Sequence, residues 1–188
     1  MLAVGAVVVV LAGYFVVSRI VNPAPSQGDD PSNDIPQLQS VKTYDYVGGD
    51  HTTDPVTYSE TPPAGGPHDP SWEDCGVYPE QPRNENVVHS LEHGTVWVTY
   101  QPDLSPADVQ SLETSLGTVK SEKTILSPYP GQSSPVVATV WNAQIALDGA
   151  DDPRLPLFLD FYGDGHTSPE GAQASCKGGV QVLASDAP

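Results

Sequence analysis

A run of about 20 mostly apolar residues at the N-terminus limits what this chain can fold into more than any other feature. No residue from Leu2 to Val17 is charged, and Ile20 and Val21 extend the apolar stretch. At about 1.5 Å per residue, about 20 helical residues span the roughly 30 Å hydrocarbon core of a bilayer. We therefore expect residues 1–21 to form one transmembrane helix that tethers the rest of the chain to a membrane.

The alternative for this segment is a cleaved signal peptide. Signal peptides have a basic stretch before a shorter apolar run and a small-residue cleavage site after it. Here no basic stretch comes before the apolar run and no clear cleavage site follows it. The positive-inside rule places basic residues on the cytoplasmic side of a membrane. Arg19 follows the apolar run, so it stands on the wrong side for a domain outside the cytoplasm, and the rule does not settle the orientation. The side of the membrane must therefore be inferred from other residues.

Composition changes sharply after the apolar run. Residues 22–43 are polar, acidic and rich in proline, with few apolar side chains to offset the entropy cost of ordering the chain. We expect them to form a flexible linker. A folded domain is then expected over residues 44–184, and residues 185–188 are expected to be a frayed tail.

The chain is strongly acidic, with 24 Asp and Glu against 7 Lys and Arg and a formal net charge of −17. Binding to nucleic acid depends on clustered basic side chains, as does adsorption to anionic lipid headgroups. This composition therefore argues against both kinds of partner. An acidic surface keeps a domain soluble and can also attract cations.

Local patterns predict an α+β fold for the domain. Apolar and β-branched residues indicate strands at 95–100, at 119–126 and within 136–147. Helix caps bound one helix at 105–117, and an apolar run predicts a second at 151–163. We expect one mostly antiparallel sheet with two main helices on one face. Residues 44–82 are rich in proline and glycine, which predicts a long irregular N-terminal wrap with a short strand at 56–58.

The two cysteines, Cys75 and Cys176, lie about 100 residues apart. Neither has a nearby Cys or His at zinc-finger spacing, which favours a disulfide over a pair of metal thiolates. In the chain-entropy model a disulfide that closes such a loop stabilises the fold by about 4–5 kcal/mol. Because disulfides form in oxidising compartments, the pair predicts a domain on the extracytoplasmic face of a cell membrane.

Histidines provide the strongest chemical signal of the domain. His89 and His93 lie four positions apart, which on a helix places them on one face where they can share a metal ion. Glu92 can be a further ligand or can orient an imidazole. His68 follows a rigid turn of prolines and glycines, and His51 completes the candidate set. Imidazole suits copper and zinc, and the alternative is a structural role in which the rings only pack and form hydrogen bonds.

The spacing H-x-x-E-H also matches the inverted zinc-protease motif. That motif needs a sustained helix, whereas Gly94 and a β-rich run follow His93 at once. The further acidic ligand would have to be a loop residue such as Glu170. We found no G-x-S-x-G motif and no glycine-rich phosphate loop in the sequence, so we predict no catalytic residue and no organic cofactor site.

Several motifs of the domain resemble the DUF3105 family of bacterial membrane-anchored envelope proteins. The most specific pair is Pro62-Pro-Ala-Gly-Gly-Pro-His68 with His89-Ser-Leu-Glu-His-Gly94, and Cys75-Gly-Val-Tyr78 lies between them. The resemblance covers nearly all of the domain and implies a cell-envelope protein. It also points to metal handling, because the family is common in actinobacteria, where its genes can neighbour a copper-associated family. The residues at the family's motif positions are His51, His68, His89, Glu92 and His93, and His166 is outside them.

Together these features predict a membrane-tethered extracytoplasmic domain that binds copper or zinc through a histidine cluster. The expected ligands are His68, His89 and His93, with His51 or Glu92 completing the set. The second hypothesis is an accessory or assembly subunit of a larger membrane protein complex, in which the cluster is structural. The third is a metal-dependent hydrolase.

Overall fold

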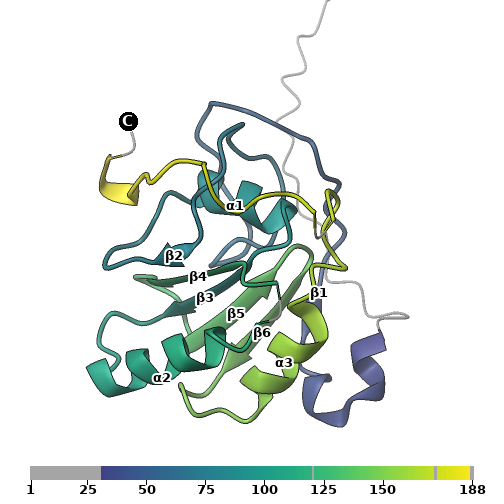
Figure 1. Cartoon of the computed structure of the whole chain (residues 1–188), viewed down its shortest axis with the longest axis vertical. Helices are drawn as coiled ribbons and strands as arrows, with labels where there is room; N and C mark the ends of the chain where they lie inside the picture. The colour runs from purple at the N-terminus through teal and green to yellow at the C-terminus, as the bar shows by residue number, and fades with distance from the viewer. Residues whose placement is uncertain (1–30, 120, 172, 187–188) are drawn as a thin grey trace, which may run out of the picture.

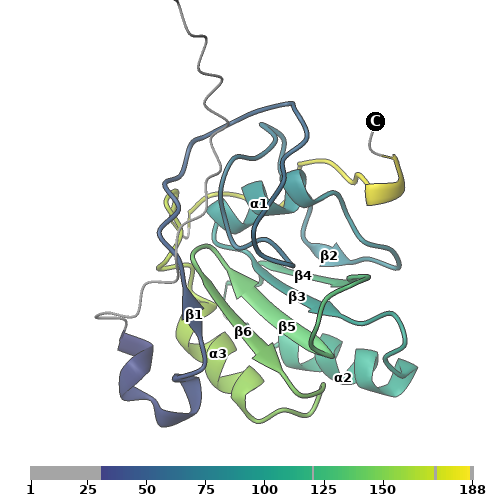
Figure 2. The same ribbon diagram turned by 180° about the vertical axis from the view of Figure 1, so that it is seen from behind.

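A six-stranded mixed sheet forms the centre of the domain, with helix α1 on one face and helices α2 and α3 on the other (Figure 1, Figure 2). The computed structural model describes residues 31–119, 121–171 and 173–186. The strand order across the sheet is β1-β6-β5-β3-β4-β2. The α+β class predicted from the sequence is confirmed. The strands are β1 (Lys42–Thr43), β2 (Gly76–Val77), β3 (Val96–Tyr100), β4 (Thr124–Pro128), β5 (Val136–Val140) and β6 (Ala143–Leu147), and the helices are α1 (Asn84–Glu92), α2 (Pro106–Leu116) and α3 (Arg154–Tyr162).

Two kinds of connection give the sheet both strand directions. Helix α2 carries the chain from β3 to β4, and these strands are parallel, as a helical crossover requires. A tight turn at Trp141 and Asn142 joins β5 to β6 as an antiparallel hairpin, and Asn142 has a φ of 64°. Among the described strands, three neighbouring pairs are antiparallel and two are parallel. The sheet is therefore more mixed than the sequence predicts, because strand direction depends on the connections.

Side chains of β3 alternate between two hydrophobic cores. Val96 and Val98 belong to the larger core, which α2 and α3 cover, whereas Trp97 belongs to a smaller core on the α1 side. All three side chains are fully buried. Coverage on both faces accounts for the almost continuous apolar character of this strand. Helix α1 rests on the smaller core through Val88 and Leu91.

The structure contains a third helix beyond the two main ones that the sequence predicts. The first of those two, α2, begins at the expected boundary, where the Ser105 hydroxyl accepts the Asp108 N–H as an N-cap. Helix α1 covers the opposite face of the sheet, so the expectation of helices on one face alone is wrong. Its amphipathic pattern is weak, because Val87, Val88 and Leu91 are the apolar members of its nine residues.

The ordered domain begins earlier than composition predicts. Residues 31–43 were expected in the linker, but they form strand β1 and two short 3-10 helices, Pro31–Asp34 and Pro36–Leu38. Leu38 is fully buried in the larger core, with Ile35 packed beside it. A few apolar side chains that meet a core can order a segment whose average composition is polar.

Apart from strand β2, residues 44–82 form an irregular wrap, as their proline and glycine content predicts. The strand expected at 56–58 does not form. The N–H of Val56 donates to the Glu85 side chain at 3.0 Å and not to a neighbouring strand. Strand β4 also begins at Thr124 and not at 119, because the preceding Glu122 has a φ of 56°, which interrupts an extended chain.

The predicted transmembrane anchor, residues 1–21, and residues 22–30 of the expected linker lie outside the described residues. Of the helices that the structure describes, none combines the length and apolar character needed to cross a membrane. At the other end, a 3-10 helix at Ala184–Asp186 extends into the expected tail.

A disulfide joins Cys75 to Cys176, as the sequence predicts. The N–H of Cys75 donates to the carbonyl of Cys176 at 2.8 Å, and the N–H of Asp74 donates to the carbonyl of Val180 at 2.9 Å. These bonds attach the C-terminal segment to the wrap. In Figure 1 this yellow segment passes next to helix α1.

Candidate metal centre

Helix α1 and the residue that ends it carry three of the predicted ligands. His89 and Glu92 lie three positions apart on one helical face, and His93 is the C-cap. The helix ends in a Schellman motif, in which Gly94 has a φ of 84° and its N–H donates to the carbonyl of Leu91. The inverted zinc-protease motif therefore lacks the sustained helix that it needs.

Loops of the wrap bring His51 and His68 next to α1. The two residues pair as an isolated parallel β-bridge. Gly65 and Gly66 form the turn before His68 with φ values of 151° and 109°, which disfavour other residues. A Cβ at Gly65 would also lie 2.6 Å from the ring of Tyr46. Close packing thus explains the glycine pair that precedes His68 in the sequence.

The turn of the β5–β6 hairpin holds the wrap in this position. The Asn142 side chain accepts the Tyr46 N–H at 2.8 Å and donates to the Tyr46 carbonyl at 3.0 Å. The backbone N–H of Asn142 donates to the Ala64 carbonyl at 2.9 Å. The neighbouring Trp141 ring packs edge-on against His68, with centroids 5.8 Å apart. Contacts between distant parts of the chain therefore locate His68.

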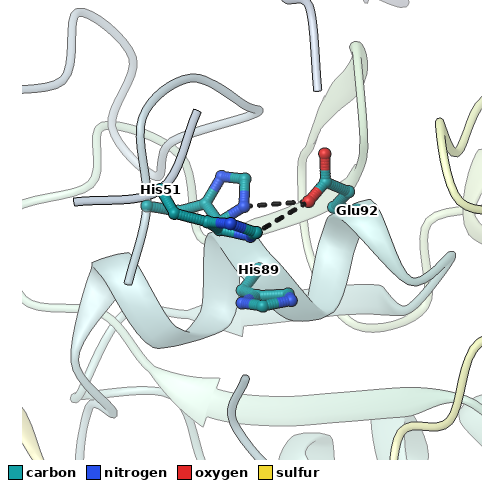
Figure 3. A group of neighbouring side chains, drawn as sticks. His51, His89 and Glu92 are labelled. Atoms are coloured by element: carbon teal, nitrogen blue, oxygen red, sulfur yellow. Dashed lines mark ion pairs between the residues drawn. The ribbon is translucent and has the colours of Figure 1, made fainter. Parts of the chain in front are cut away.

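Three histidines and one glutamate bring their potential ligand atoms together. His51, His68, His89 and Glu92 each offer one atom, and all four atoms lie within 4.8 Å of one another. Figure 3 shows the His51 ring and the Glu92 carboxylate joined by a dashed line beside α1, with the His89 ring close by. Ligand atoms of a zinc ion lie about 2.0–2.2 Å from it, so opposite ligands are at most about 4.4 Å apart. A slight contraction would let this group hold one ion.

The hydrogen bonds of the three buried imidazoles indicate which ring nitrogen is available. A carbonyl oxygen can only accept, so a ring nitrogen bonded to one carries the proton, and Nε2 of the neutral ring keeps its lone pair. A histidine that binds a metal through Nε2 usually makes this kind of outer hydrogen bond. In each ring Nδ1 lies 2.6–2.8 Å from a backbone carbonyl, and the pairs are His68 with Gly66, His89 with Asp69, and His93 with Ser175.

The Glu92 carboxylate is held at one oxygen and directs the other at the histidines. Its Oε1 accepts the Gly49 N–H at 2.5 Å, and a Cβ at Gly48 would collide with that oxygen. Its Oε2 lies 2.9 Å from Nε2 of His68 and 3.9 Å from Nε2 of His51. Within the described part of the chain, neither Oε2 nor Nε2 of His68 has a hydrogen-bond partner. Two such buried acceptors side by side are stabilised by a cation between them.

His89 occupies the middle of the cluster. Its ring centroid lies 5.0 Å from that of His51, 4.9 Å from that of His68 and 4.6 Å from that of His93. Burial lowers the pKa of His89, and the neighbouring imidazoles lower it further, against the opposing effect of the hydrogen bond to the Asp69 carbonyl. His89 is therefore neutral at pH 7, and its Nε2 is free to bind a metal.

His93 belongs to a second group of potential ligands. His89, His93 and Glu170 each offer one atom within 4.8 Å of the others, and Nε2 of His93 lies 3.2 Å from Oε2 of Glu170. The loop that carries Glu170 is attached to the end of α1, because the Ser168 hydroxyl and the Glu170 N–H both donate to the Glu92 carbonyl. Sequence reasoning named Glu170 only as the acid that a zinc protease would require.

The predicted residues thus lie together, but in two groups that share His89. His166 is in neither group, and its ring pairs with Asp164 at 2.6 Å.

The backbone groups that orient the cluster have no sequence signal, because every residue has a carbonyl and nearly every residue has an N–H. Two parts of the surroundings could be recognised in the sequence. They are the glycines that precede His68, and Glu170 itself.

The donor atoms limit which metals suit the cluster. They are imidazole nitrogens and carboxylate oxygens, and Cys75 and Cys176 cannot supply thiolates because they are joined in a disulfide. Nitrogen and oxygen donors suit divalent zinc or copper, whereas Cu(I) prefers thiolate and thioether sulfur.

The fold and the cluster define a class of protein, namely a small α+β domain with a buried histidine–glutamate group that could hold a divalent metal ion. Residues 51–178 match the family described as "Protein of unknown function (DUF3105)", which is more than half of the chain. The chain therefore belongs to the DUF3105 family, as its motifs predicted. No curated protein and no solved structure matches the chain significantly. The matched range includes both cysteines and every residue of the two ligand groups.

Proposed function

We propose that this protein binds a divalent transition-metal ion through His51, His68, His89 and Glu92. The main support is the contact of 2.9 Å between Nε2 of His68 and Oε2 of Glu92, two atoms without a hydrogen-bond partner among the described residues. The two side chains are 0% and 1% exposed, so bulk water does not reach them. A cation bound between them removes the cost of burying both atoms unpaired. Binding needs no change of tautomer, because the outer nitrogens of His68 and His89 already face carbonyls.

Zinc and copper(II) are the metals that this donor set favours. Neutral imidazole and carboxylate ligands are common to both ions. The formal net charge of −17 raises the local concentration of any divalent cation near the domain. We therefore propose that the protein acts as a binding or delivery protein for zinc or copper(II).

We also infer that the domain is tethered to the extracytoplasmic face of a cell membrane. The apolar run at residues 1–21 supports the tether. The Cys75–Cys176 disulfide supports an oxidising compartment. A domain tethered in this way would handle metal ions at the membrane surface.

Metal analysis of the full-length chain, purified in mild detergent, tests the proposal. We expect about one equivalent of zinc or copper per chain after desalting, and a Kd that is about 100-fold weaker in Glu92→Gln. His166→Ala is the matched control, because His166 is 43% exposed and pairs with Asp164 outside both ligand groups. A wild-type chain that binds neither ion tightly would refute the proposal, as would an unchanged Kd in Glu92→Gln.

The alternative is an accessory or assembly subunit of a larger membrane protein complex. Val47 and Val77 in the wrap are 83% and 57% exposed, as residues at a contact surface would be. Such a subunit would co-purify with stoichiometric partners, and substitutions in the cluster would change its stability without changing its metal content. A metal-dependent hydrolase has less support, because Glu92 is turned toward His51 and His68.

A further inference from the structure

The two ligand groups depend on the same imidazole. We call His51, His68, His89 and Glu92 the inner group, and His89, His93 and Glu170 the outer group. Nδ1 of His89 is bonded to the Asp69 carbonyl at 2.7 Å, which leaves Nε2 as its one free nitrogen. His89 can therefore serve the inner group or the outer group, but not both at once. Without His89, the outer group keeps only two ligand atoms.

The two groups differ in their access to solvent. The Glu170 side chain is 45% exposed, whereas that of Glu92 is 1% exposed. His51, at the opposite end of the cluster, is 41% exposed, but the carboxylate oxygen that faces its Nε2 at 3.9 Å belongs to the buried Glu92. A hydrated dication that approaches the domain therefore meets an accessible carboxylate at the outer group.

We propose that the outer group is a second metal position, which captures a divalent ion before His89 passes it to the inner group. A site with three protein ligands keeps open positions for water and so exchanges more readily than a site with four. His89 lies within 5.0 Å, between ring centroids, of the rings on either side. The transfer thus requires only that one imidazole changes partners. This inference rests on the proposed function of the inner group.

The rate of copper(II) uptake by the metal-free full-length chain tests this proposal. Trp72 lies 5.0 Å from His93 and Trp141 lies 5.8 Å from His68, measured between ring centroids, so bound copper(II) should quench tryptophan fluorescence from either position. We expect stopped-flow uptake to be about tenfold slower in Glu170→Gln, with an equilibrium Kd within about twofold of wild type. Glu92→Gln should show the opposite pattern, with rapid uptake and a Kd that is about 100-fold weaker.

His166→Ala is the control and should match wild type in both rate and Kd. A wild-type uptake rate in Glu170→Gln would overturn the outer position and leave the proposed function intact. The proposal would also be overturned if His51→Ala, and not Glu170→Gln, slowed uptake, or if native mass spectrometry found two tightly bound ions per chain. Failure of the wild type to bind copper(II) or zinc would overturn the proposed function itself.

Discussion

Replacement of Glu92 by glutamine distinguishes a metal site from a structural ion pair. Oε1 of Glu92 accepts the Gly49 N–H, and Oε2 faces Nε2 of His68 at 2.9 Å without hydrogen-bond geometry between them. Glutamine has the same shape and keeps the acceptor for Gly49. Its amide nitrogen replaces Oε2, so it can donate to Nε2 of His68. The substitution removes a buried charge and supplies a donor where the wild type has two acceptors.

The two interpretations predict stability changes of opposite sign. Each unsatisfied buried polar atom costs about 1–3 kcal/mol, and glutamine provides a partner for His68 Nε2. We therefore expect metal-free Glu92→Gln to be about 1–3 kcal/mol more stable than the metal-free wild type. If His68 were instead an imidazolium in a permanent ion pair with Glu92, loss of one partner would destabilise the fold by about 3–5 kcal/mol.

Urea unfolding of the full-length chain at pH 7.5, with chelator and then with zinc, measures both quantities. Zinc at 100 times its Kd should stabilise the wild type by about 2.7 kcal/mol, and the same concentration should stabilise Glu92→Gln by a small fraction of that. His166→Ala should behave as wild type in both series. A metal-free Glu92→Gln that is less stable than wild type would refute the idea that this cluster is built around a cation.

Two further predictions concern stability outside the ligand groups. Burial raises the pKa of Glu73 from 4.5 to about 7, because the buried carboxyl disfavours its charged form. The contribution of the protonated Glu73 to the free energy of unfolding is therefore fully present below pH 4.5 and declines by about 3 kcal/mol as the pH rises through 7. In urea titrations Glu73→Gln should gain on wild type at pH 8 but not at pH 4.5, and an equal difference at both pH values would contradict this. The double variant Cys75→Ser with Cys176→Ser opens a loop with a sequence separation of 101 and should lose about 4–5 kcal/mol. An unchanged urea midpoint would contradict that expectation.

Features that depend on a few neighbouring residues could be predicted from the sequence. The cap at Ser105 marks the start of α2, because an N-cap side chain bonds to the same turn of helix. The pairing of Cys75 with Cys176 required no structure, because two cysteines allow one intramolecular disulfide. Strand directions could not be obtained in this way. The parallel pairing of β3 with β4 depends on how α2 packs across the sheet.

The sequence by itself determined which side chains are candidates for a metal site. The spacing of His89, Glu92 and His93, and the glycines before His68, identified candidate ligands within short segments. The division of the cluster into an inner and an outer group was decided only by the tertiary structure. That division depends on backbone carbonyls, which every residue possesses, and on contacts such as that of Asn142 with Tyr46, which are 96 positions apart. Interactions over such separations leave no local pattern, because either residue alone is compatible with many folds.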